Sequence, residues 1–204
     1  GVRAIIGTAY LVSGDLAVTC HHVALEIADG DKLGVEFINV GQVAEARVDS
    51  CNEEADCAVL RLERRVESVE PLLVARTCRM SVPWSSFGYP RRARFAGIPM
   101  VGSVEDLNGI ANDGKPAHTL VSNQFKDTPI NGMSGSPVVV GGVVVGHLRR
   151  MLTDHVEQED GPAPILSICY ATPSRFVVEL LEKHGLAVVE TVRAPQGSEA
   201  CVQI

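Results

Sequence analysis

The sequence predicts an all-β protein made of two antiparallel β-barrels, followed by a C-terminal helix. Short apolar stretches recur at regular intervals between turn-rich segments, a pattern typical of antiparallel barrels. A charged and then apolar stretch near residues 65–80 interrupts this pattern and indicates a boundary between two β units. Near the C-terminus the apolar residues take helical spacing. We therefore expect barrels at residues 1–75 and 76–172, a helix at 173–186 and a tail or linker at 187–204.

The N-terminal half alternates short predicted strands with polar turns. Its first two strands surround the turn Ser13-Gly14-Asp15, and one helical turn is expected at residues 24–28. An acidic loop at residues 51–55 precedes the last strand. The expected strands of this half span residues 7–12, 16–19, 32–40, 42–49 and 57–62.

The C-terminal half resumes the strand pattern at residues 86–90 and carries the clearest hairpin of the chain. Val138-Val139-Val140 and Val143-Val144-Val145 are separated by Gly141-Gly142, and such a glycine pair favours a tight two-residue turn. Residues 108–116 are rich in glycine, asparagine and aspartate, so we expect a turn there. The last strands are expected at residues 143–149 and 165–171.

A helix is predicted after these strands. Ser174 is expected to cap it, and Gly185 is expected to end it after about His184. The apolar face of this helix consists of Phe176, Val177, Leu180 and Leu181. Such a helix can cover one side of a barrel.

Composition excludes several classes of function. The net charge of −7 argues against a nucleic-acid-binding protein, which needs a basic face. No apolar run reaches the roughly 20 residues of a membrane span, and no signal peptide is visible, so we expect a cytoplasmic location. The cysteines show no metal-ligand spacing, and we expect free thiols, no metal and no cofactor. They are Cys20, Cys51, Cys57, Cys78, Cys169 and Cys201.

The stretch Gly132-Met133-Ser134-Gly135-Ser136-Pro137 is the strongest indication of chemistry. A serine flanked by glycines and followed by proline cannot lie in a regular helix or a central strand. The stretch therefore predicts a tight turn that presents the Ser134 hydroxyl beside a rigid sheet, as a nucleophile requires. The alternative is an ordinary Gly/Ser surface loop.

Two further stretches bear on this choice. Thr19-Cys20-His21-His22-Val23 ends one predicted strand, and Asp56-Cys57-Ala58-Val59-Leu60 begins another. In this order and context, His, Asp and Ser resemble the residues of the chymotrypsin-like serine peptidases, especially the compact bacterial branch with the HtrA peptidases and the glutamyl endopeptidases. The resemblance extends from about Ile6 to Gly185. It implies two six-stranded antiparallel β-barrels, a chymotrypsin-like fold with a C-terminal helix.

The same resemblance implies a role for each residue of the motifs. Ser134 is the expected nucleophile, His22 its general base and Asp56 the residue that orients His22. The backbone N–H groups of Gly132 and Ser134 are expected to form the oxyanion hole. His21 is the alternative base, but strand alternation points it the other way and favours a packing role.

Two positions near the nucleophile depart from the best-known members of the family. Met133 stands where zymogen-activated members have an aspartate that pairs with a freed N-terminus, so we expect regulation through loops, a partner or a fused domain. Residues 123–131 and the basic loop at 91–94 are the segments expected to move. In the isolated domain we therefore expect low basal activity.

Specificity is also suggested by position. By the same resemblance, the residue six places before the nucleophile, Thr128, and the residue two places after Gly146, Leu148, are expected to line the S1 pocket. They favour a small or medium apolar P1 residue. Asp127 is one place away, and a shifted loop would instead favour Arg or Lys.

The resulting hypothesis is a serine endopeptidase that acts on protein or peptide substrates through an acyl-enzyme. We expect neither a nucleic acid nor a membrane as partner. The chain is interpreted as the protease domain of a regulated cytosolic bacterial protein in a stress or defence system, with a fused or associated regulatory domain. The alternative is a non-catalytic module that binds peptides on a peptidase fold.

Overall fold

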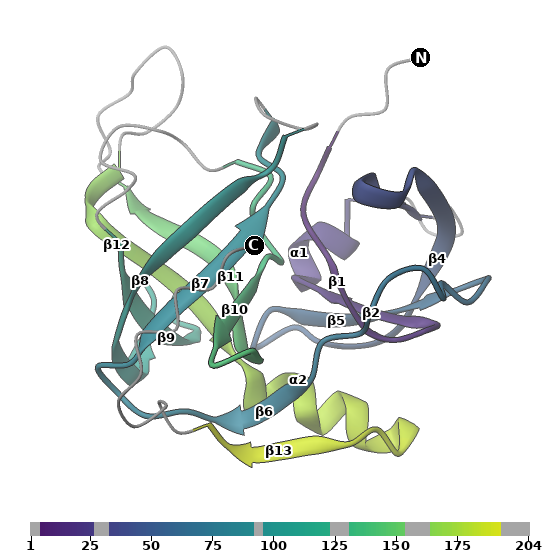
Figure 1. Ribbon diagram of the computed structural model, residues 1–204. Coiled ribbons are helices and arrows are strands. Elements are labelled where there is room, and N and C mark those ends of the chain that lie inside the picture. The colour runs from purple at the N-terminus through teal and green to yellow at the C-terminus, as the bar shows by residue number, and fades with distance from the viewer. Residues whose placement is uncertain (1–4, 27–32, 92–95, 123–130, 154–163, 193–204) are drawn as a thin grey trace.

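Two β structures lie side by side in the computed structural model (Figure 1). The structure describes residues 5–26, 33–91, 96–122, 131–153 and 164–192. The N-terminal sheet, in purple and blue, and the C-terminal barrel, in teal and green, are joined at their base by a helix and two strands. No helix in these described ranges is long and apolar enough to cross a membrane.

The N-terminal sheet contains five strands within the described residues, all antiparallel, in the order β1-β2-β5-β4-β3. Leu11, Ala17 and Leu60 belong to the buried cluster on one of its faces. The short helix α1 (His21–Ala24) follows β2 directly, and a 3-10 turn (Ile38–Val40) follows β3. The strands are β1 (Tyr10–Ser13), β2 (Leu16–Thr19), β3 (Leu33–Phe37), β4 (Gln42–Asn52) and β5 (Cys57–Leu62).

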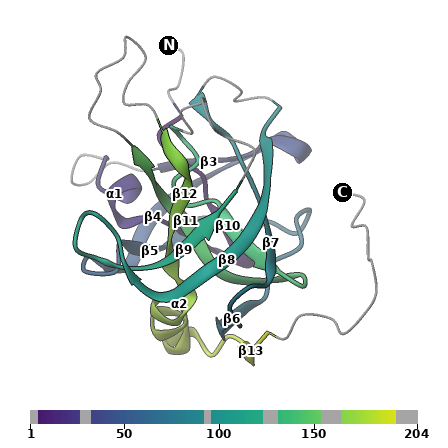
Figure 2. The ribbon, with the colours of Figure 1, turned by 90° about the vertical axis from the view of Figure 1, so that its left-hand side faces the viewer.

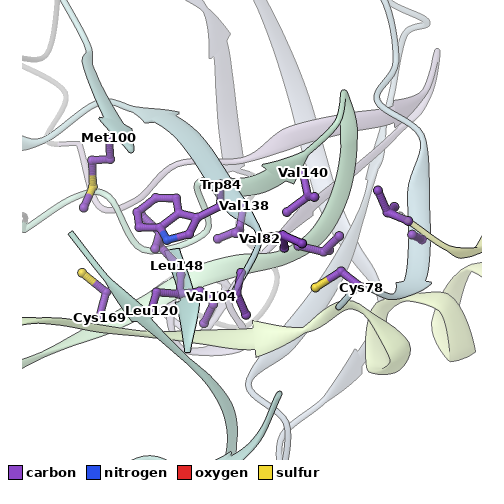
Figure 3. Close-up of a cluster of buried hydrophobic side chains, with 14 of the residues drawn as sticks. Cys78, Val82, Trp84, Met100, Val104, Leu120, Val138, Val140, Leu148 and Cys169 are labelled. Carbon is purple, nitrogen blue, oxygen red and sulfur yellow. The ribbon is translucent and has the colours of Figure 1, made fainter. Parts of the chain in front are cut away.

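The C-terminal sheet closes into a six-stranded barrel, because β10 (Pro137–Val140) pairs with both β7 (Pro83–Gly88) and β11 (Val143–Thr153). Between β7 and β11 the order continues through β8 (Ile98–Ile110), β9 (Pro116–Val121) and β12 (Pro164–Pro173). The barrel core contains Trp84, Met100, Leu120 and Leu148 (Figure 3). The predicted valine hairpin is β10 and β11, with Val140 opposite Val143.

Two further strands extend this sheet at the base of the molecule. β6 (Val74–Thr77) runs parallel to β11, and β13 (Val188–Thr191) runs parallel to β6. Strand pairing therefore changes from the first sheet to the second between β5 and β6. The predicted boundary between residues 75 and 76 falls within β6, and the predicted domain boundaries stay predictions.

Helix α2 (Ser174–Leu181) covers the junction of the two sheets, as Figure 2 shows at the lower edge of the molecule. A 3-10 turn (Glu182–His184) continues it, and Gly185 ends it in the left-handed conformation with φ +65°. Val177 and Leu181 share a buried cluster with Val18 of β2 and Val144 of β11. The helix thus packs against both halves.

The predicted fold class is confirmed, but several local predictions differ from the structure. The helical turn expected at residues 24–28 occurs at His21–Ala24, so His22 lies on a helix rather than at a strand end. Pro173 occupies the N-cap of α2, and Ser174 is its first residue and forms no side-chain cap. The segment predicted as a tail begins with β13, because valines at its start pair with the edge strand β6.

Candidate active site

His22 is placed by the turn from strand β2 into helix α1. Cys20 is extended, with φ −69° and ψ 146°, and the helix begins at the next residue. His21 is buried with 8% of its surface exposed, whereas the His22 side chain is 48% exposed. The structure therefore gives His21 a packing position and presents His22 to solvent.

Asp56 lies just before β5 in a left-handed backbone conformation, with φ +57°. Its N–H donates to the carbonyl oxygen of Glu53 at 3.2 Å, which closes a tight turn. The carboxylate is nearly buried and meets His22 twice: Oδ1 accepts from the backbone N–H at 2.9 Å, and Oδ2 lies 2.8 Å from Nδ1. Burial by itself raises the pKa of Asp56, but the hydrogen bonds from His22 outweigh burial and hold that pKa below its usual value.

The loop with Ser134 is fixed to the neighbouring strands through its backbone. Gly135 N–H donates to the Leu148 carbonyl at 2.7 Å, and the Ser134 carbonyl accepts from Thr8 N–H at 2.8 Å. Gly135 has φ +90°, which favours glycine. The loop is therefore held by both halves of the molecule.

The hydroxyl of Ser134 is half-buried and donates to the carbonyl oxygen of Arg149 at 3.2 Å. Among the described residues no hydrogen bond joins it to the His22 ring. Catalytic hydrogen bonds are often long or misaligned until a substrate is bound.

The peptide between Asn131 and Gly132 has a defined direction. The Asn131 carbonyl accepts from Arg91 N–H at 2.8 Å, and the Gly132 carbonyl accepts from Thr8 Oγ1 at 2.9 Å. In a planar trans peptide the C=O and the following N–H point to opposite sides. The Gly132 N–H is therefore directed away from Arg91.

Of the two residues predicted to line the S1 pocket, the structure describes only Leu148. Thr128 lies outside the described residues, as does Asp127. Leu148 is 1% exposed and packs in the barrel core with Trp84 (Figure 3). Since its side chain points into the core, its assignment to S1 gains no support and stays a prediction.

Sequence reasoning missed a buried charge on Arg149, the residue whose carbonyl accepts from the Ser134 hydroxyl. The Arg149 side chain is only 1% exposed, and its guanidinium binds Asp113 Oδ1 at 3.2 Å and the Pro116 carbonyl at 3.3 Å. A buried guanidinium without such partners is strongly unfavourable. No local signal distinguishes Arg149 from its exposed neighbour Arg150 in the sequence.

Cys20, His22 and Asp56 bring three possible metal ligands together, with their ligand atoms within 4.8 Å of one another. The Cys20 thiol is fully buried and donates to the Leu148 carbonyl at 3.3 Å. Burial, followed by the nearby Asp56, raises the pKa of Cys20 well above its usual value. The thiol and the Asp56 carboxylate are thus already paired within the protein, with Leu148 and with His22.

Most of this chain matches the model of one known protein family. Residues 7–147, more than half of the chain, match the model of the trypsin-like peptidase domain. The chain belongs to the trypsin-like peptidase family. The predicted resemblance is confirmed, and membership supports a serine peptidase activity. No curated protein matches the sequence.

Solved structures of trypsin-like peptidases share this fold. The active form of the Rv3671c protease from M. tuberculosis has a TM-score of 0.64 and 21% identity, covering 97% of this chain and 78% of its own. The inactive form of that protease has a TM-score of 0.63 and 21% identity, over 90% and 86% of the two chains. The HtrA-type protease AlgW with a decapeptide has a TM-score of 0.66 and 16% identity, over 87% of this chain and 51% of AlgW.

Proposed function

We propose that this peptidase-family chain is a serine endopeptidase that hydrolyses protein or peptide substrates through an acyl-enzyme. Ser134 is the proposed nucleophile, His22 its general base and Asp56 the residue that orients the base. The observation that carries the proposal is the pair of hydrogen bonds, 2.8 and 2.9 Å long, between His22 and the Asp56 carboxylate. An imidazole held in this way is ready to accept a proton from a serine hydroxyl.

The proposed reaction begins at the His22 ring. Since the ionised Asp56 carboxylate only accepts hydrogen bonds, Nδ1 carries the proton and Nε2 is the basic nitrogen. Ser134 Oγ leaves the Arg149 carbonyl, transfers its proton to Nε2 and attacks the substrate carbonyl carbon. The buried Asp56 carboxylate stabilises the resulting imidazolium, which then protonates the leaving amine.

The tetrahedral intermediate needs donors for its negative oxygen. The proposed donors are the backbone N–H groups of Gly132 and Ser134. The bond from Arg91 to the Asn131 carbonyl supports this assignment, because it directs the Gly132 N–H away from Arg91, and no backbone carbonyl of the described residues accepts from that N–H. Water then hydrolyses the acyl-enzyme with His22 again as the base.

A fluorophosphonate probe tests the proposal, since only an activated serine reacts with it. The wild-type protein is expected to be labelled on Ser134, and Ser134→Ala is expected to remain unlabelled. His22→Ala and Asp56→Asn are expected to slow labelling by at least about 10³-fold. His21→Ala is the matched control and is expected to retain most of the rate. An unlabelled, folded wild-type protein that still binds peptides would favour the non-catalytic binding module instead.

The finer parts of this proposal concern substrate, location and control. We propose a small or medium apolar P1 residue, with a basic one as the alternative, and cleavage of a peptide library distinguishes the two.

Free cysteines among the described residues support a reducing, cytoplasmic setting. A role in a regulated bacterial stress or defence protein is proposed from the family resemblance, and cleavage assays with and without neighbouring domains test it.

A further inference from the structure

The backbone of Asp56 has a conformation that needs support from its surroundings. A non-glycine residue with φ +57° is strained by about 1–2 kcal/mol relative to ordinary regions. Its side chain can meet both N–H groups of His22 only while the backbone stays in this conformation. Contacts that hold the Asp56 peptide therefore matter for the position of the carboxylate.

Those contacts come from the C-terminal barrel. His147 of β11 has Nε2 at 3.3 Å from the Asp56 carbonyl oxygen. Thr172 of β12 donates from Oγ1 to the Ala55 carbonyl at 3.0 Å and lies 3.5 Å from the Asp56 carbonyl. His147 and Thr172 are direct partners across the two strands, and both are 0% exposed. Together they fix the two peptide groups that precede β5.

The His147 ring is in a state that suits this role. Its Nε2 faces a carbonyl, so Nε2 carries the proton and donates. Nδ1 has no hydrogen-bond partner in the described part of the chain. The Tyr10 ring of the first sheet packs beside the imidazole, with the two ring centroids 6.4 Å apart. Burial is the main reason that the pKa of His147 is lowered to about 4, and the ring is neutral near neutral pH.

We propose that His147, assisted by Thr172, is a positioning residue that holds Asp56 in the geometry that orients His22. This inference rests on the proposed function. In this proposal Asp56 belongs to the N-terminal half, and residues of the C-terminal barrel, which carries Ser134, hold it in place. A loss of the His147 hydrogen bond leaves the Asp56 carbonyl unpaired and frees the strained turn to relax.

The test compares two substitutions at one site. His147→Leu removes the donor at similar volume, whereas His147→Gln keeps an amide N–H near the position of Nε2. For His147→Leu we expect kcat to fall about 10- to 100-fold with KM within twofold, since misplacement of a catalytic group by about 1 Å costs up to 10² in rate. His147→Gln is expected to regain most of kcat.

His118→Leu is the matched control. His118 is also a buried histidine of the C-terminal barrel, but its Nδ1 lies 2.9 Å from the Leu107 carbonyl rather than beside the Asp56 peptide. Its substitution is expected to lower stability but to leave kcat per folded molecule unchanged. An equal loss of kcat in His118→Leu and His147→Leu would overturn the positioning role.

A second readout does not depend on turnover. The proton NMR resonance of Nδ1–H of His22 reports its bond to Asp56, and we expect it to shift or broaden in His147→Leu only. An unchanged resonance together with unchanged kcat would refute the inference. If wild-type Ser134 proves unreactive, the proposed function fails, yet this resonance still tests whether His147 positions Asp56.

Discussion

The backbone N–H of Arg91 donates a hydrogen bond of 2.8 Å to the carbonyl oxygen of Asn131. This bond joins the β7–β8 connection to the loop that carries Ser134. From the sequence alone the Gly132 N–H could point toward Arg91 or away from it, because glycine adopts positive φ readily. Here Gly132 has φ +100°. A side chain would also not fit, since a Cβ on Gly132 would lie 2.9 Å from the Tyr89 carbonyl oxygen.

Arg91→Pro is expected to lower kcat by about 10- to 100-fold, approaching the 10²–10³ that the loss of one oxyanion donor costs. Proline has no N–H, so the Asn131 carbonyl loses its donor and the peptide is free to turn over. Steady-state kinetics on a peptide substrate measure the effect. Arg91→Ala is the control: it keeps the N–H and loses the exposed contact of Nε with the Ile5 carbonyl. Equal activity in both variants would show that the bond has no catalytic effect.

Gly135→Ala is expected to destabilise the protein by about 2–5 kcal/mol and to abolish activity. A Cβ at this position would overlap the Thr8 carbonyl oxygen and the Thr19 hydroxyl oxygen, and φ is +90°. Gly142→Ala is the matched control, because φ is +84° there but no described atom lies within 4 Å of the added carbon. It is expected to cost only about 1–2 kcal/mol. Urea unfolding of both variants measures the difference, and similar losses would contradict the steric argument.

Two buried histidines predict how stability depends on pH. Burial, the largest cause, lowers the pKa of both His118 and His147 from 6.5 to about 4. Between pH 6.5 and 4 the unfolded chain therefore binds protons that the folded chain excludes, so stability is full above pH 6.5 and falls as the pH falls through this window. Each group contributes about 3 kcal/mol to the fall.

Urea unfolding between pH 4 and 8 checks this sign and size. In His118→Leu the slope of the unfolding free energy against pH is expected to decrease by about half. A stability that rises on acidification across this range would contradict the burial of the neutral rings.

Thiol reactivity is expected to separate Cys51 from the other cysteines of the described residues. Cys51 is exposed, whereas Cys20, Cys57, Cys78 and Cys169 are buried. Burial raises the pKa of Cys57 to about 12, of Cys78 to about 11 and of Cys169 to about 12, so few thiolates form.

In a Cys201→Ser background, one fast equivalent is expected with an aromatic disulfide reagent. Cys51→Ser should remove that equivalent, and peptide hydrolysis should remain unchanged by the reaction. Rapid modification of several thiols in the native protein would show that the buried sites open readily.

Much of the fold was predictable because local patterns agree with it. The valines on either side of Gly141-Gly142 can form little else than a buried hairpin, and the helix face with Val177 and Leu181 shows the spacing of its buried side. The strand β13, at the start of the segment predicted as a tail, was not foreseen because its pairing depends on the edge strand β6, more than 100 residues earlier in sequence. Edge pairing at such a distance leaves no local signal.

In the proposed site, too, local motifs were predictable and long-range contacts were not. His22, Asp56 and Ser134 stand in short motifs, so the sequence singles them out. Contacts between the halves carry no motif: Thr8 binds the Gly132 carbonyl across 124 residues, and His147 binds the Asp56 carbonyl across 91. Both follow from the packing of the two sheets, which no window of sequence contains.

The attachment of the Ser134 loop to Thr8 has a consequence for refolding. Trp84 is the only tryptophan of the chain and lies in the core of the C-terminal barrel, with Nε1 bonded to the Ser103 carbonyl at 3.1 Å. Its fluorescence therefore follows the collapse of one half alone. In the proposed mechanism Ser134 depends on His22, and its loop is bonded to Thr8, both from the other half, so its reactivity is expected to return only after the halves have docked. The delay between the two signals after dilution from denaturant is the lifetime of a folded but undocked molecule.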